Sequence, residues 1–179
     1  MSDDARSALA RRIYETAHIT GEFTLRSGAK SNEYFDKYLF EADPKLLRDI
    51  AEAMAPLVPP GVDALAGLEM GGIPLATMLS QLTGLPVLFV RKKAKEYGTC
   101  KIAEGGRLRG RKLLIVEDVV TSGGAILDAA RALREEGAEL GGVVCVIDRE
   151  SGGPANLAKT NLTLKPLFTM SELKSCGRR

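Results

Sequence analysis

Histidine, cysteine and tryptophan are scarce in this 179-residue sequence, which contains one, three and none of them. The cysteines, Cys100, Cys145 and Cys176, are scattered and odd in number, so they predict neither a disulfide framework nor a zinc site. His18 has no cysteine or second histidine to accompany it as a ligand, and we interpret it as a surface or packing residue. The sequence therefore indicates a reducing, cytoplasmic environment.

Long apolar runs and a strong excess of one charge are also missing. No segment approaches the ~18 apolar residues that span a bilayer, and the acidic N-terminus lacks the basic start of a signal peptide. The formal net charge is +2, which indicates neither a nucleic-acid nor a membrane partner. The nucleotide loops G-x-x-x-x-G-K-[ST] and G-x-G-x-x-G are absent, which argues against a P-loop ATPase or a dinucleotide dehydrogenase.

The composition that remains is ordinary for a globular protein, and the length predicts a single domain over residues 1–179. Helices are predicted over residues 4–18 and 44–57, with short strands at 22–28 and 32–40 between them. Further along, strands are predicted at 63–69, 86–90, 112–117, 140–149 and 162–169, with helices at 71–84 and 123–137 and a short helix near the end. This alternation predicts an α/β fold whose parallel sheet is covered on both faces.

The segment "LLIVEDVVTSGG", residues 113–124, concentrates acids, hydroxyls and glycines at one strand end. Parallel sheets bind ligands beyond the carboxyl ends of their strands, so we expect Glu117 and Asp118 to stand unburied at that edge. The following "TSGG" begins a helix, whose free N–H groups can hold an anion while the carboxylates hold a polyol. A phosphorylated sugar has both groups. The simpler alternative is a capped helix start with acids near its dipole.

This pattern of four apolar residues, two acids, two apolar residues and "TSGG" resembles the signature with which type I phosphoribosyltransferases bind 5-phosphoribosyl 1-diphosphate (PRPP). Four further stretches make roughly residues 20–153 similar to the orotate phosphoribosyltransferases: "FTLRSGAKSNEYFD", "LEMGGIPLA", "RKKAKEYGTCKIAEGG" and "DRESGG". The resemblance implies a central parallel sheet flanked by helices, with a small hood formed by residues 1–40 and the C-terminal tail. It also implies transfer of the phosphoribosyl group to orotate, giving orotidine 5′-phosphate and pyrophosphate in pyrimidine biosynthesis.

The resemblance also assigns the PRPP site. Glu117 and Asp118 would hold the ribose hydroxyls, directly or through magnesium, and Asp118 would be catalytic together with Lys95. The 5′-phosphate would lie in the loop that follows, formed by Val119, Val120, Thr121, Ser122, Gly123, Gly124 and Ala125. The leaving pyrophosphate would face a second loop, formed by Glu69, Met70, Gly71 and Gly72. The alternative for its glycines is a tight turn between strand and helix.

Residues 91–112 hold nine basic and two acidic side chains, although the whole chain is nearly neutral. A charge run is usually a solvated face, but a loop of this length inside a compact domain is commonly a catalytic lid. The resemblance places Arg91, Lys92, Lys95 and Tyr97 in the PRPP site, and it sends Lys92 to the neighbouring site of a homodimer. Tyr97 stands where relatives often carry histidine, and it can donate a hydrogen bond but is no near-neutral acid.

For the base, the resemblance assigns three residues to orotate: Arg149, Thr121 and Arg26. Arg26 stands where other members carry lysine, and it keeps the charge with a different geometry. A guanidinium fork suits the carboxylate or a carbonyl edge of orotate. The alternative for Arg149 is a structural ion pair with Asp148 or Glu150. Tyr34 and Phe35 could pack near the base or belong to the core.

Two other functions remain open from the sequence. One is a phosphoribosyltransferase for adenine, a 6-oxopurine or uracil, and the other is a PRPP-sensing regulator that binds RNA or DNA without chemistry. The lid with Lys95 and the lack of a separate DNA-binding segment favour the enzyme. Its expected partners are PRPP, orotate, magnesium and a second copy of the chain, without nucleic acid or membrane. No Ser/His/Asp arrangement is visible, so we expect direct displacement at the anomeric carbon of PRPP.

Overall fold

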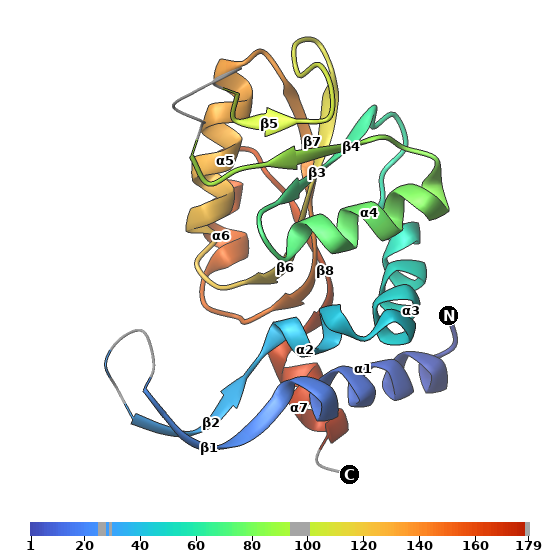
Figure 1. Ribbon diagram of the computed structural model, residues 1–179, viewed down its shortest axis with the longest axis vertical. Helices are drawn as coiled ribbons and strands as arrows, with labels where there is room; N and C mark the ends of the chain where they lie inside the picture. The colour runs from blue at the N-terminus through green and yellow to red at the C-terminus, as the bar shows by residue number, and fades with distance from the viewer. Residues whose placement is uncertain (25–27, 29, 94–100, 178–179) are drawn as a thin grey trace.

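A six-stranded sheet forms the centre of the computed structural model, which describes residues 1–24, 28, 30–93 and 101–177. The strand order is β5-β4-β3-β6-β7-β8 (Figure 1). Five strands run parallel: β3 (Ala64–Leu68), β4 (Val87–Val90), β6 (Lys112–Val120), β7 (Glu139–Asp148) and β8 (Leu164–Thr169). The short β5 (Ala103–Glu104) pairs antiparallel with β4. The predicted α/β class with a central parallel sheet is thereby confirmed.

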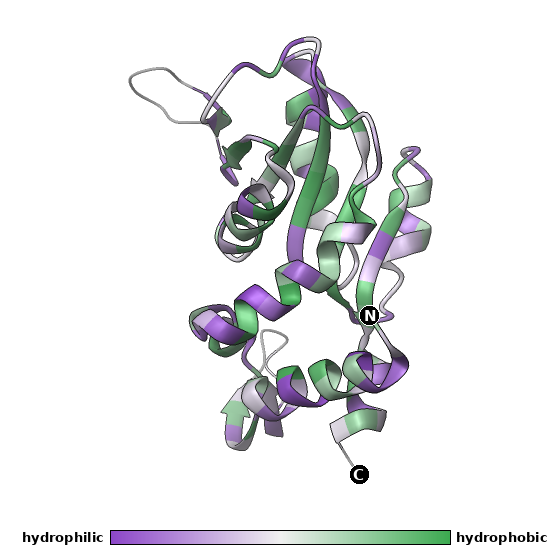
Figure 2. Cartoon of the chain, turned by 90° about the vertical axis from the view of Figure 1, so that its right-hand side faces the viewer, coloured by the Kyte–Doolittle hydropathy of each residue, from purple (hydrophilic) through white to green (hydrophobic). Residues whose placement is uncertain are grey.

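Helices cover both faces of this sheet, and the sheet separates the apolar interior into two cores. Along β6, Leu114 and Val116 belong to one core, whereas Leu113 and Ile115 belong to the other, because successive strand residues point to opposite faces. The helices α3 (Pro44–Met54) and α4 (Gly72–Thr83) pack on the first face, and α5 (Gly124–Glu135) and α6 (Gly153–Ala158) pack on the second. The strands between them are largely green in Figure 2, as their apolar sequences require.

The two ends of the chain meet below this sheet (Figure 1). They comprise α1 (Asp3–Ala17), the hairpin of β1 (His18–Thr24) and β2 (Lys30–Phe35), and α7 (Met170–Gly177). Arg6 of α1 donates to the carbonyl of Leu167 at 2.7 Å and forms a 3.1 Å ion pair with Glu172. A short helix α2 (Lys37–Ala42) connects the hairpin to α3, and the single turn η1 (Ala55–Leu57) follows α3.

The predicted strand over residues 32–40 is wrong in its second half. β2 ends at Phe35, and α2 begins two residues later. The Asp36 carboxylate accepts a hydrogen bond from the Tyr38 N–H at 3.1 Å and so caps the helix. The aromatic residues in this segment favour a strand, whereas the Asp36 cap starts a helix.

The expectation that Glu117 and Asp118 stand unburied at a strand end is also wrong. β6 continues to Val120, which pairs with Asp148 of β7, so the two acids lie within the strand. Glu117 is 9% exposed and Asp118 is fully buried. Two further elements were not predicted, namely β5 inside the expected long loop and the short helix α6. Among the described residues, no helix combines the length and apolar character needed to cross a membrane.

Candidate active site

Four of the predicted functional segments come together because their strands are neighbours. The strands β4, β3, β6 and β7 are adjacent in the sheet and parallel, so their carboxyl ends share one edge. Residues 69–72 follow β3, Arg91 and Lys92 follow β4, residues 119–125 end β6 and lead into α5, and Arg149 follows β7. This edge is where open parallel sheets bind their ligands.

A cavity of about 420 Å³ lies at this edge. Six of the residues that line it were predicted to bind PRPP: Glu69, Arg91, Lys92, Glu117, Gly124 and Ala125. The Lys92 N–H donates to the Glu69 carboxylate at 2.6 Å, which joins the loop after β3 to the loop after β4. Arg91 lies 4.0 Å from Glu104 of β5. The cavity therefore combines two cationic residues with the carboxylate of Glu117.

The two acids of β6 have different neighbours. Glu117 lines the 420 Å³ cavity, and its carboxylate accepts a hydrogen bond from the Asp118 N–H at 3.0 Å. Burial, reinforced by the neighbouring Asp118, raises the pKa of Glu117 well above its usual value. Asp118 lies instead against α2, where its Oδ2 is 2.5 Å from Lys37 Nζ. The two carboxylates therefore have different surroundings, although they also interact with each other.

Asp118 has a second acidic neighbour, Glu41, on the same helix as Lys37. Burial alone would raise the pKa of Asp118, but its hydrogen bonds and the charge of Lys37 outweigh burial and lower it. Glu41 is 9% exposed, and burial together with the proximity of Asp118 raises its pKa to about 8. At neutral pH this cluster therefore holds a protonated Glu41 beside an ionised Asp118 and a cationic Lys37.

The loop of residues 69–72 is packed so closely that only glycine fits two of its positions. A Cβ on Gly71 would overlap Asp118 Oδ2, and a Cβ on Gly72 would overlap the carbonyl oxygen of Val116. Met70 is exposed beside them. The missing side chains of these glycines therefore let the loop backbone pack directly onto the buried acid.

The loop of residues 119–125 presents backbone and hydroxyl groups. Gly123 has a φ of 80° and immediately precedes α5, so the first N–H groups of that helix are free for an anion. Thr121 and Ser122 are exposed, whereas Val120 is buried in the core, and Val119 is partly buried. Because the Val120 side chain is buried, this residue could contact a ligand only through its backbone. Its carbonyl already accepts a hydrogen bond from the Arg149 N–H at 2.8 Å.

Arg149 belongs to a second cavity, of about 230 Å³, between the β1–β2 hairpin and α7. Tyr34 and Phe35 line the same cavity, as do Tyr14, His18, Ser31, Glu33, Met170 and Lys174. In the described part of the chain, Arg149 forms no ion pair with its neighbours. Asp148 accepts from the Glu150 N–H, and Glu150 accepts from the N–H and hydroxyl of Ser171. The structural ion pair considered for Arg149 is therefore not formed there.

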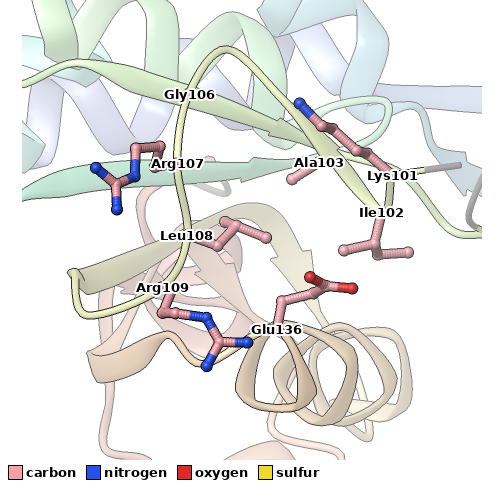
Figure 3. Close-up of a pocket in the computed structure, with 8 residues that line it drawn as sticks. All are labelled: Lys101, Ile102, Ala103, Gly106, Arg107, Leu108, Arg109 and Glu136. Carbon is pink, nitrogen blue, oxygen red and sulfur yellow. The ribbon is translucent and has the colours of Figure 1, made fainter. Parts of the chain in front are cut away.

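A third hollow, of about 290 Å³, lies beneath the loop after β5 (Figure 3). Its basic residues are Lys101, Arg107 and Arg109, of which Arg109 extends toward Glu136, and none of the predicted site residues lines it. It shares Ile102 with the 420 Å³ cavity. Three predicted site residues, Arg26, Lys95 and Tyr97, lie outside the described residues.

Sequence reasoning missed Lys37 and Glu41, which surround Asp118. Their spacing of four residues places them on one face of a helix, but the aromatic residues of the same segment favour a strand and obscure that signal. It also missed the helical wall of the larger cavity, where Asp128, Ala129 and Ala132 of α5 lie behind the phosphate loop.

Glu41 is expected to make the stability of the fold depend on pH. Its folded pKa of about 8 exceeds the ordinary value of 4.5, so the folded chain keeps a proton that the unfolded chain releases. This stabilisation is complete below pH 4.5 and is lost as the pH rises through about 8. We expect the free energy of unfolding in urea to fall between about pH 5.5 and about pH 8.5, and to fall less in Glu41→Gln.

Glu117 also has a raised pKa, so it makes the free energy of unfolding fall with pH in the same direction. The difference in slope between the wild type and Glu41→Gln therefore isolates the contribution of Glu41. Glu135→Gln, at an exposed position of α5, serves as the matched control and should keep the wild-type slope. Equal slopes in the wild type and Glu41→Gln would contradict the assignment.

Comparison with known proteins identifies a family whose sequences resemble this chain. A family model described as a phosphoribosyl transferase domain matches residues 40–163. An orotate phosphoribosyltransferase of Nocardioides sp. is 56% identical over 167 residues, which cover 93% of both chains. One of Methanocella arvoryzae is 46% identical over 153 residues, covering 86% of this chain and 87% of that protein.

Solved structures agree with the sequence relatives. The orotate phosphoribosyltransferase of Mycobacterium tuberculosis H37Rv in complex with Fe(III) dicitrate superposes with a TM-score of 0.85 and 28% identity, covering 94% of this chain and 98% of that one. The same enzyme in complex with PRPP gives a TM-score of 0.81 at 25% identity, covering 95% and 99%. The chain therefore belongs to the phosphoribosyltransferase family, and within it to the orotate phosphoribosyltransferases.

Proposed function

We propose that this chain transfers the phosphoribosyl group of PRPP to orotate, forming orotidine 5′-phosphate and pyrophosphate for pyrimidine biosynthesis. The observation that carries the proposal is the pairing of two cavities at one sheet edge. One cavity offers Arg91, Lys92 and Glu117 beside a glycine-bounded helix start, and the other offers Arg149 between aromatic residues. The hydrogen bond from the Arg149 N–H to the Val120 carbonyl links the two loops that border them.

The 420 Å³ cavity suits PRPP because each part of that molecule finds a matching group. The 5′-phosphate would bind the free N–H groups and hydroxyls of residues 119–125. The ribose hydroxyls would meet the carboxylate of Glu117, with Asp118 supporting the site from the opposite face of β6. The pyrophosphate would lie between residues 69–72 and the cationic side chain of Arg91.

The 230 Å³ cavity suits a planar anionic base. The exposed guanidinium of Arg149 would bind the carboxylate or a carbonyl edge of orotate. Tyr34 and Phe35 would flank the ring, and the exposed hydroxyl of Thr121 would donate from the neighbouring loop. Arg26, in the same N-terminal segment, is proposed as a further contact to the base.

The reaction would proceed by displacement at the anomeric carbon. A ring nitrogen of orotate attacks as pyrophosphate leaves, and negative charge builds on the departing oxygens. Arg91 stabilises that charge from a fixed position after β4, and Lys95 is proposed to approach it from the lid. Groups that are oriented before the reaction stabilise developing charge most effectively, because they need no reorganisation.

The residues present fit magnesium in the manner of phosphate-binding enzymes. Magnesium is usually held by one or two carboxylates plus substrate oxygens, and Glu117 and Asp118 are the proposed carboxylates, directly or through water and ribose. Within the described ranges, no group of three acidic, histidine or cysteine side chains could hold a metal without the substrate. A bound magnesium ion would supply positive charge to the pyrophosphate.

A substrate panel tests the reaction. With PRPP and magnesium, we expect turnover of orotate, and none of adenine, hypoxanthine, guanine or uracil, because Arg149 is placed to bind a carboxylated base. The loss of orotate absorbance and the release of pyrophosphate measure the rate. Turnover of another base in place of orotate would favour a different phosphoribosyltransferase, and PRPP binding without turnover of any base would favour a regulator.

Removing divalent metal should abolish turnover. The pyrophosphate of PRPP and the ionised Asp118 are both anionic and would repel each other without a cation between them. We would titrate EDTA against the rate with orotate and then restore magnesium. Full activity in metal-free buffer would contradict the requirement, whereas recovery on adding magnesium excludes damage by the chelator.

Arg149→Ala should raise the KM for orotate at least about tenfold, because a hydrogen bond to a charged group contributes about 1.5–3 kcal/mol. The KM for PRPP should change little, because Arg149 does not line the larger cavity. Arg48→Ala, at an exposed position of α3, controls for the loss of a positive charge. Equal increases for both substrates would mean that Arg149 supports the structure rather than the base.

A homodimer with shared sites is the proposed assembly, in which the Lys92 side chain reaches the site of the neighbouring subunit. Mixing the inactive variants Lys92→Ala and Asp118→Ala tests it. Each mixed dimer would have one site with both lesions and one with neither, so random exchange should restore about a quarter of all sites. If Lys92 acts within its own chain, every site carries a lesion and no activity returns. Subunit exchange is verified separately with labelled chains.

A further inference from the structure

Lys37 is a cationic residue of α2 that contacts Asp118. The proposed reaction does not use this contact. Its Nζ lies 2.5 Å from Asp118 Oδ2, and the Asp118 side chain has no exposed surface. Burying a carboxylate without a partner is costly, so this ion pair is the main compensation for placing Asp118 inside β6. The Asp118 carboxylate is also held at its other oxygen, where Oδ1 accepts from the Val119 N–H at 2.5 Å.

The position of Lys37 is set by the packing of α2 rather than by solvent. Asp36 caps the helix at its start, and Phe40, three residues after Lys37, is fully buried in the core beneath α1 and α3. Glu41, one turn beyond Lys37, packs on the same side of α2 against Asp118 and Gly71. The Lys37 ammonium is therefore presented to β6 from a fixed element.

Asp118 in turn touches the loop that is proposed to face pyrophosphate. A Cβ on Gly71 would overlap Asp118 Oδ2 and lie 2.6 Å from Glu41 Oε1, so the loop backbone rests on this cluster. Displacement of the carboxylate would therefore displace the loop of residues 69–72. Lys37 is linked to the PRPP site through Asp118, without lining the 420 Å³ cavity itself.

We propose that Lys37 is a positioning residue that holds Asp118, and through it the loop of residues 69–72, in the arrangement that binds PRPP. This inference rests on the proposed function, and it adds a residue outside the motif at the end of β6. Lys37 touches neither substrate in this account. Its contribution is to keep the buried carboxylate and the pyrophosphate loop in place before PRPP arrives.

The test replaces Lys37 and measures PRPP binding directly. Lys37→Met keeps the length of the side chain and removes its charge, and Lys37→Arg keeps the charge. Lys45→Met, at an exposed position of α3, removes a charge from the neighbouring helix and is the matched control. We expect the dissociation constant of PRPP, measured by calorimetry with magnesium, to rise on the order of 10- to 100-fold in Lys37→Met. Lys37→Arg should recover part of the loss, and Lys45→Met should match the wild type.

Two further measurements separate positioning from a general structural role. The KM for orotate at saturating PRPP should stay at the wild-type value, because Lys37 does not line the 230 Å³ cavity. A displaced hairpin would raise it, since Tyr34 and Phe35 line that cavity. In an Asp118→Asn background, Lys37→Met should weaken PRPP binding little further, because the partner through which it acts has lost its charge.

The outcomes are distinguishable from failure of the proposed function. A wild-type chain that binds no PRPP would refute that function itself. A wild-type chain that binds PRPP, with unchanged affinity in Lys37→Met, would overturn the role of Lys37. If the losses of PRPP affinity in Lys37→Met and Asp118→Asn multiply fully in the double variant, the role of Lys37 would be overturned as well. If Lys37→Met does not fold, Lys37→Gln, which keeps a donor beside Asp118, takes its place with the same expectations.

Discussion

A fully buried carboxylate in the central strand is the constraint on which the rest of this structure depends. Asp118 has no exposed surface, and leaving it without a counter-charge would cost several kcal/mol. Lys37 supplies that charge from α2, so α2 must lie against β6. Because α2 directly follows the β1–β2 hairpin, the same ion pair helps to fix the N-terminal elements beside the edge where the sheet binds ligands.

The same constraint explains why the loop of residues 69–72 contains glycine at its centre. Gly71 lies against the Asp118 carboxylate and Gly72 against the carbonyl of Val116, and neither position has room for a Cβ. Contacts beneath this loop therefore hold its backbone, and Glu69 at its start lines the larger cavity. A buried acid, a lysine from another element and two glycines together form a rigid floor for the proposed pyrophosphate site.

The two cavities at the sheet edge divide the proposed binding groups between the parallel sheet and the ends of the chain. The parallel strands supply the residues around the larger cavity. The smaller cavity is formed mainly by the β1–β2 hairpin, α1 and α7, with Arg149 reaching it from the end of β7. In this arrangement the sheet edge recognises the phosphorylated sugar, and the joined termini recognise the base.

The sequence by itself determined the alternating strands and helices, because apolar periodicity is local. It also predicted six of the residues that line the larger cavity, because they follow strands of one sheet. It did not reveal that Glu117 lines the larger cavity whereas Asp118 lies against α2, because a sequence motif carries no information on burial. The helix at residues 37–42 was missed because its aromatic residues favour a strand. Only the tertiary structure brought Lys37 and Glu41 to Asp118, since an ion pair between distant elements depends on how the sheet and helices pack.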